Sequence, residues 1–155
     1  MENIVKSGFQ FTNPVLEDIQ FKTYPIKTDI KKSKVNVSVQ FNSQVSDPQK
    51  IGQLLVSKLA LTVNAKCTEN KNRIYSIKVV YSSSFRSNSK MKVEEFANLV
   101  KVNGSSLLLS YVRTLIADLT SRSGYDAFQL PFVDFTKAIK NLNYQIKCNT
   151  DSNRS

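Results

Sequence analysis

The chain has 155 residues, of which 41% are apolar and 22% charged, and its 22 basic and 12 acidic residues give a formal net charge of +10. This composition is typical of one folded domain and excludes a disordered or membrane-embedded chain. Histidine is absent and glycine occurs four times, so the commonest general base and a glycine-rich nucleotide loop are missing. We therefore expect a non-enzymatic protein without a cofactor.

A secretion signal, a membrane-spanning segment and paired cysteine motifs are also missing from the sequence. Residues 1–8 lack the apolar segment of a secretion signal, and no run of 18 apolar residues occurs. We therefore expect a cytoplasmic protein that does not insert into membranes. Cys67 and Cys148 are far apart and belong to no paired motif, which predicts reduced thiols and no metal site.

Alternation of apolar and polar residues predicts strands over residues 34–43, 54–67 and 73–84. Residues 15–24 look extended as well, with Ile19 and Phe21 on one face. Residues 46–52 contain an Asp-Pro pair and a glycine and cannot continue a strand, so a loop is expected there. The short polar connection between the last two strands favours an antiparallel sheet.

The apolar period changes from two to about 3.6 after residue 92, which predicts helices. A short helix is expected over residues 93–100. A longer one, residues 105–121, should begin with Ser105 or Ser106 as N-cap and end near Gly124. After an extended linker over residues 125–132, a second C-terminal helix capped by Asp134 is predicted. Its apolar side would consist of Phe135, Ala138, Ile139 and Leu142.

Strands followed by helices predict an α+β fold. We expect one domain over residues 1–146, followed by a disordered polar tail over residues 147–155 that has little to bury. One sheet with two helices covers little area, and apolar residues on both its faces would remain exposed in a single subunit. Self-association is therefore expected.

Two parts of the sequence resemble one known family. The segment from Tyr111 to Arg122, followed by Tyr125, Phe128, Leu130, Pro131, Val133, Asp134 and Phe135, is similar to the C-terminal half of the SecB protein-export chaperones. Near the start, the Phe-Gln-Phe at residues 9–11 and the segment 15–21 look like the first strand of that family. The resemblance runs from about residue 9 to residue 142.

The resemblance implies a four-stranded antiparallel sheet packed with two C-terminal helices. It also implies a homotetramer, a dimer of dimers held together largely by the long helix. The interface residues would then be Tyr111, Val112, Leu115, Ile116 and Leu119. Packing in the core of a single subunit is compatible with the same pattern.

The implied function is that of an ATP-independent holdase, which binds unfolded polypeptides in apolar grooves. The positions that match the client groove of the family are Val37, Val39, Phe41, Phe135, Ile139 and Leu142. Ordinary core packing remains an alternative for each of them. The positive charge predicts a preference for acidic and aromatic client segments.

One departure from the family concerns SecA, the motor ATPase that SecB chaperones dock through carboxylates on the exposed sheet face. Asp18 keeps one such position, whereas Lys22 and Lys78 occupy two that are normally glutamate. Like charges would repel the basic tail of SecA. Service to a dedicated client, such as guarding an antitoxin in a toxin-antitoxin-chaperone system, is therefore an equal alternative to protein export.

Two hypotheses of other classes follow from the same residues. A basic nucleic-acid-binding module would use the net charge together with Tyr75, Tyr81 and Phe85 on the sheet, although no binding motif is present. A structural adaptor would bind one folded partner. The scattered lysines favour neither hypothesis, since solvated lysines on strands also prevent pairing between sheet edges.

Overall fold

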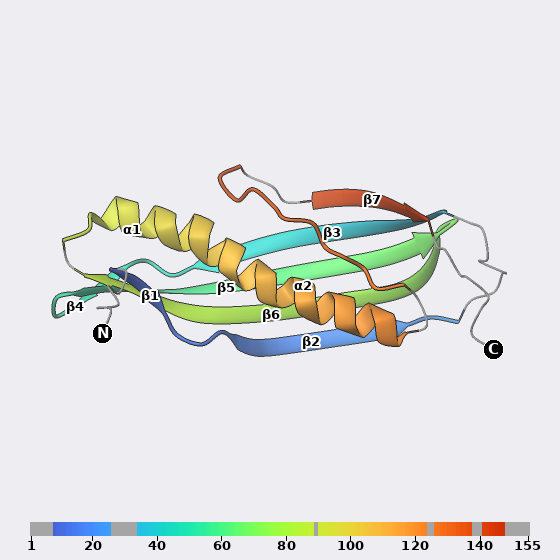
Figure 1. Cartoon of the computed structure of the whole chain (residues 1–155), viewed down its shortest axis with the longest axis horizontal. Coiled ribbons are helices and arrows are strands. Elements are labelled where there is room, and N and C mark those ends of the chain that lie inside the picture. Colours follow the sequence, from blue (N-terminus) through green and yellow to red (C-terminus); the bar gives the residue numbers. More distant parts are fainter. Residues whose placement is uncertain (1–7, 26–33, 89, 124–125, 138–140, 148–155) are drawn as a thin grey trace, which may run out of the picture.

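The computed structural model describes residues 8–25, 34–88, 90–123, 126–137 and 141–147. Strands occupy the first half of the chain, and one long helical stretch follows them (Figure 1). The elements are β1 (Phe9–Phe11), β2 (Val15–Thr23), β3 (Lys34–Val45), β4 (Gln49–Ile51), β5 (Leu54–Glu69), β6 (Asn72–Asn88), α1 (Val93–Leu99), the π-helical turn η1 (Val100–Gly104), α2 (Ser105–Arg122) and β7 (Asn141–Lys147).

The strands of the described residues form one antiparallel sheet in the order β1-β6-β5-β3-β7, with β2 also paired to β6 and β4 to β5. The long β5–β6 hairpin closes with Glu69 opposite Asn72. Asn70 and Lys71 in the turn have φ angles of 46° and 66°, which match the twist of a two-residue hairpin turn. Gly52, with φ of 59°, makes the corresponding turn between β4 and β5.

One face of the sheet is covered by α1, η1 and α2, which run on as a single bent helix (Figure 1). The long helix α2 begins at Ser105 as predicted, but the expected serine N-cap is wrong, because the helical turn runs on through Gly104, which has φ of −63° and ψ of −46°. A Cβ added there would lie 2.9 Å from Leu59 and 3.0 Å from Phe85. The glycine therefore allows the helix to approach the sheet, and the Ser105 hydroxyl bonds to that of Ser43 at 3.2 Å.

The core lies between this helix and the inner face of the sheet. Alternate residues of β3, β5 and β6 point into it, as the sequence predicts, and apolar residues of α1, η1 and α2 close it from above. The largest fully buried side chains are Phe85, Phe96, Leu59, Leu61, Leu108, Leu109, Ile116, Leu130, Val37, Val39, Val63 and Val79. The predicted α+β class is confirmed.

The predicted second C-terminal helix does not form in the described residues. Residues 135–137 form a turn, in which the Asp134 carboxylate accepts a hydrogen bond from the backbone nitrogen of Thr136 at 3.0 Å. Residues 141–147 form β7, which pairs with β3, so the sheet exceeds four strands. An alternation at Leu142, Tyr144 and Ile146 suits a strand, and β7 covers the edge that β3 would otherwise expose. Ala138, Ile139 and residues 148–155 lie outside the described residues.

Candidate functional site

The predicted client-binding residues are split by the structure between core and surface. Val37, Val39 and Phe41 on β3 are only 1%, 0% and 7% exposed. Phe41 meets the half-buried Phe135 edge to face, with ring centroids 6.3 Å apart. Leu142 lies opposite Val39 in the β7–β3 register, and Ile139 is not among the described residues. A client could therefore reach Val37 and Val39 only if the residues that cover them moved aside.

Residues 126–137, here called the strap, return along the helix and carry Phe135 to β3 (Figure 1). Residues 126–134 form neither helix nor strand. Phe128 and Leu130 are buried in the core, whereas Phe132 is 82% exposed. The strap thus has an apolar underside and presents one large aromatic ring to solvent.

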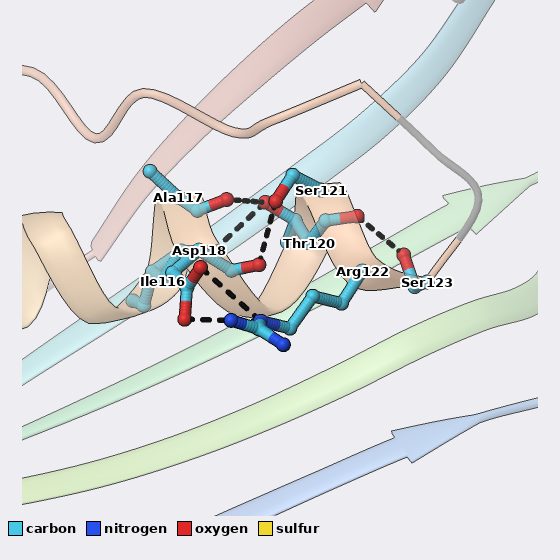
Figure 2. Close-up of polar contacts among 7 residues, drawn as sticks. All are labelled: Ile116, Ala117, Asp118, Thr120, Ser121, Arg122 and Ser123. Carbon is cyan, nitrogen blue, oxygen red and sulfur yellow. Dashed lines mark hydrogen bonds and ion pairs between the residues drawn. The ribbon is translucent and has the colours of Figure 1, made fainter.

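The C-terminal turn of α2 anchors the start of the strap. The buried Thr120 hydroxyl donates to the carbonyl of Ile116 at 2.8 Å, a contact drawn in Figure 2. The same oxygen accepts a hydrogen bond from the backbone nitrogen of Phe128 at 2.8 Å. At the surface, Arg122 Nε pairs with the Asp118 carboxylate at 3.2 Å (Figure 2). One buried hydroxyl therefore joins the helix end to the strap.

The middle of α2 anchors the strap a second time, through Arg113. Its Nε atom donates to the backbone carbonyl of Leu130, and its guanidinium carbon lies 4.0 Å from the centroid of the Phe132 ring. A cation over an aromatic face is attracted by the ring quadrupole. Arg113 thereby fixes both the backbone and the exposed ring of the strap.

The predicted oligomer-interface residues fall on two sides of α2. Val112 and Ile116 are 0% exposed and face the sheet. Tyr111 is 40% exposed, and Leu115 and Leu119 are half-buried. Tyr111 also meets Tyr81 of β6, with ring centroids 5.8 Å apart. Only Tyr111, Leu115 and Leu119 present surface that a second copy could contact.

A groove of about 840 Å³ runs along this outer side of α2, here called the helix groove. It is lined by Tyr81, Leu107, Ser110, Tyr111, Thr114, Leu115 and Asp118. Leu16 and Ile19 of the neighbouring β2 are each 40% exposed, so apolar surface continues beyond it. Contiguous apolar surface of this kind marks interaction sites in other proteins.

The three residues of the predicted translocase-docking face lie together on the sheet face opposite the helix. Asp18 is close to Lys78, with 3.5 Å between carboxylate and ammonium, and Gln20 Nε2 donates to the same carboxylate at 3.2 Å. A hollow of about 630 Å³ includes Lys22, Lys66 and Lys78 in its lining. The face therefore carries more positive than negative charge.

The aromatic residues of the nucleic-acid hypothesis are not available for stacking. Tyr75 and Phe85 are 4% and 1% exposed, and Tyr81 is half-buried beside Tyr111. Single-stranded nucleic acids need exposed rings on which bases stack.

In the described parts of the chain, no helix has the length and apolar character needed to cross a membrane.

Sequence reasoning predicted an extended linker over residues 125–132 and a groove role for Phe135, but it gave no role in the site to Arg113, Phe128, Leu130 or Phe132. The available signal was the spacing Phe128, Leu130, Phe132, in which apolar residues recur every second position as in extended chain. The strap is the feature of the site that the structure adds.

Comparison with known proteins assigns the family. The family model described as preprotein translocase subunit SecB matches residues 4–145. The chain belongs to the SecB family. SecB members are chaperones rather than enzymes, so the non-enzymatic prediction is confirmed at the level of the family.

The relatives of this SecB-family chain are distant in sequence. The protein-export protein SecB of Orientia tsutsugamushi strain Boryong is 26% identical over 84 residues, which are 54% of this chain and 52% of that protein. SecB of Ehrlichia ruminantium strain Gardel is 26% identical over 124 residues, 77% of this chain and 71% of that protein. The match thus spans about half the length of the Orientia protein.

A solved structure shares the fold of this SecB-family chain. It is a SecB-like chaperone of Mycobacterium tuberculosis in complex with a ChAD peptide from the HigA1 antitoxin. The TM-score is 0.66 at 13% sequence identity, with 81% of this chain and 91% of that one covered. The likeness confirms the SecB-like fold.

Proposed function

We propose that this SecB-family chain is an ATP-independent holdase of the cytoplasm that binds unfolded polypeptides beside the strap. The observation that carries the proposal is the exposed Phe132 ring, which Arg113 holds on the same strap that carries Phe135 to Phe41. Large exposed aromatic rings on a chain segment outside helices and strands are suited to varied apolar side chains.

The mechanism needs binding energy but no chemistry. An extended client would place apolar side chains against Phe132 and Phe135 and, where the strap shifts, against the buried face of β3. Each anchored side chain contributes roughly 1.5–3 kcal/mol. Micromolar affinity corresponds to about 8 kcal/mol, so several anchors are needed after the cost of ordering the client is subtracted.

A second copy of the chain is the proposed occupant of the helix groove. Tyr111, Leu115 and Leu119 line or flank it, and Leu16 and Ile19 extend its apolar surface. Assembly through this surface into a dimer, or into a dimer of dimers, would bury what one subunit leaves exposed. It would also place several client sites on one particle.

An antitoxin is one candidate for a dedicated client, alongside general export clients. The mycobacterial SecB-like chaperone was solved with an antitoxin peptide bound, and the fold is shared. The lysines at positions 22 and 78 weigh against the standard handover to SecA, because they would oppose a basic tail. These two considerations support service to a dedicated client as strongly as service to export.

Suppression of aggregation by the purified chain, without ATP, tests the holdase. A chemically unfolded client should stay soluble at a few-fold molar excess of the chain, and Phe132→Ser should weaken this effect. The variant should lower the melting temperature by no more than about 4 °C, since Phe132 is 82% exposed and loses only its cation–π contact with Arg113. Ile51→Ser is a matched control, because Ile51 is 58% exposed on β4, away from the strap. Unchanged aggregation in the presence of the wild-type chain would refute the proposal.

A further inference from the structure

We propose that the sheet face opposite the helix is a docking site for an acidic polypeptide segment, separate from the surface that holds clients. The site, here called the basic face, comprises Lys22 on β2, Lys66 on β5, Arg73 and Lys78 on β6, and the polar residues between them. It does not depend on the proposed holdase activity, because it lies on the other side of the sheet.

Strand register brings these side chains onto one surface. Lys22 pairs with Ser76, and Ser76 pairs with Lys66, so the three form one row across β2, β6 and β5. In the next row Lys78 lies between Gln20 and Asn64. Adjacent strands are about 4.8 Å apart, which places the backbones at Lys22 and Lys66 about 10 Å apart.

The positive charge of the basic face is only partly compensated. Asp18 pairs with Lys78 at 3.5 Å. Within the described ranges, neither Lys22, Lys66 nor Arg73 takes part in an ion pair of 4 Å or less. Lys22 and Lys66 are exposed, so their ammonium groups are available to an outside carboxylate.

A tyrosine gathers two of the cations at one end of the face. Arg73 Nη1 donates to the Tyr24 hydroxyl at 3.5 Å, and Lys22 Nζ lies 5.0 Å from the centroid of the same ring. The bond from Arg73, a second one from Ser76 and both positive charges hold the pKa of Tyr24 below its ordinary value of 10.0. The Tyr24 ring is thus already in contact with two cations of the same chain, Lys22 and Arg73.

The shape of the face suits an extended segment. The helix lies on the other face of the sheet (Figure 1), and the twisted strands β2, β6 and β5 enclose a hollow of about 630 Å³ here. In a segment of polyproline II conformation, with three residues per turn and a rise of about 3.1 Å per residue, carboxylates three residues apart lie on the same side about 9 Å apart. This spacing is close to that of Lys22 and Lys66, so an acidic residue at every third position would meet both lysines.

A nucleic acid fits the same face less well. Sequence-tolerant binding of single strands combines a long basic track with exposed rings on which bases stack. Here three lysines line one hollow, Asp18 pairs with one of them, Lys78, and the Tyr24 ring is in contact with Lys22 and Arg73. The observations therefore favour carboxylates of a polypeptide as the ligand.

Fluorescence anisotropy with a labelled 12-residue peptide of Asp, Glu, Gly and Ser tests the proposal. Lys22→Gln/Lys66→Gln should raise its Kd about tenfold, because two facing charges are lost, and raising salt should weaken binding by the wild-type chain. The control Lys50→Gln/Lys101→Gln removes the same charge from exposed positions on β4 and η1 and should change the Kd less than about twofold.

Three results would overturn the proposal: equal Kd values for both double variants, displacement of the peptide by an unfolded uncharged client, or tighter binding of an oligothymidylate of equal charge. Aggregation suppression by Lys22→Gln/Lys66→Gln should match that of the wild-type chain. Loss of peptide binding and loss of holdase activity are therefore distinguishable, and a thermal melt verifies that both double variants fold.

Discussion

The guanidinium carbon of Arg113 lies 4.0 Å from the centroid of the Phe132 ring, while the Nε atom of Arg113 donates to the carbonyl of Leu130. One helical side chain thus holds both the backbone of the strap and its most exposed aromatic residue. The strap is joined to α2 at a second point, by the bond from Phe128 to Thr120. The stability of the proposed client site therefore depends on contacts from the helix.

Arg113→Ala should loosen the strap without unfolding the chain. A charge-assisted hydrogen bond contributes roughly 1.5–3 kcal/mol, and a cation–π contact at an exposed ring about 0.5–1 kcal/mol. Backbone amides of residues 126–137 should therefore exchange with deuterium faster, whereas those of β5 and β6 should not. Hydrogen exchange read by mass spectrometry measures both.

Arg122→Ala is the matched control for this prediction. Arg122 pairs only with Asp118 among the described ion pairs, at 3.2 Å and with its side chain 74% exposed, so it should contribute about 0.3–0.5 kcal/mol. Strap exchange should remain that of the wild-type chain. Equal exchange in the Arg113 and Arg122 variants would contradict an anchoring role for Arg113.

Thr120→Val should destabilise the chain by about 1–3 kcal/mol, because a buried hydroxyl that accepts from Phe128 is replaced by a methyl group of similar size. Urea unfolding followed by circular dichroism measures the change. Thr114→Val is the control, since Thr114 is exposed and bonds only its own helix, at Ser110. A loss of equal size in the two variants would show that the Phe128 contact adds nothing.

Much of the fold was predictable because strand period and burial coincide. On β5, every second residue from Leu55 to Cys67 is buried, as the alternation in the sequence predicts, and the residues between them are half-buried or exposed. The prediction of a second C-terminal helix was wrong because Phe135 and Leu142 also suit a helical period. A short segment does not distinguish the helical period of 3.6 from the strand period of two. Residues 141–147 form a strand because they pair with the edge of β3, and a pairing between such distant residues cannot be read from the local sequence.

The candidate site was harder to predict than the fold. Alternation places Val37, Val39 and Phe41 on one face, but it does not tell whether that face is open or covered. Likewise, the apolar stripe of α2 includes both Val112, which faces the sheet, and Tyr111, which faces outward. Whether the β3 face is covered depends on the strap, and which side of α2 faces the sheet depends on the direction in which the helix crosses it. Both depend on contacts between residues far apart in the sequence.

Tyr111→Ser/Leu115→Ser should lower the mass of the assembly while the subunit remains folded. Both side chains line the helix groove and neither is fully buried in one subunit. Light scattering after size exclusion measures the mass. Ile116→Ala should behave differently, because Ile116 is 0% exposed and its truncation costs about 2–5 kcal/mol of subunit stability. An unchanged mass in the double serine variant would refute the proposed interface.

Stability should depend on pH through Glu17. Its carboxylate accepts a hydrogen bond from Ser82 Oγ at 2.6 Å and lies 3.1 Å from Lys58 Nζ, and both contacts hold the pKa of Glu17 below its ordinary value of 4.5. Because the folded-state pKa is the lower one, the contribution is fully present above pH 4.5 and is lost as the pH falls through the folded-state value.

The melting temperature of Glu17→Gln should therefore lie below that of the wild-type chain at pH 7, and the gap should narrow as the pH falls below 4.5. The gap should be small and should shrink with added salt, since the Glu17 side chain is 38% exposed and solvent screens the pair. Asp47→Asn, at an exposed position in the loop between β3 and β4, is the control and should show little gap at pH 7. A Glu17→Gln gap that stays constant from pH 7 to pH 3 would contradict the assigned contacts.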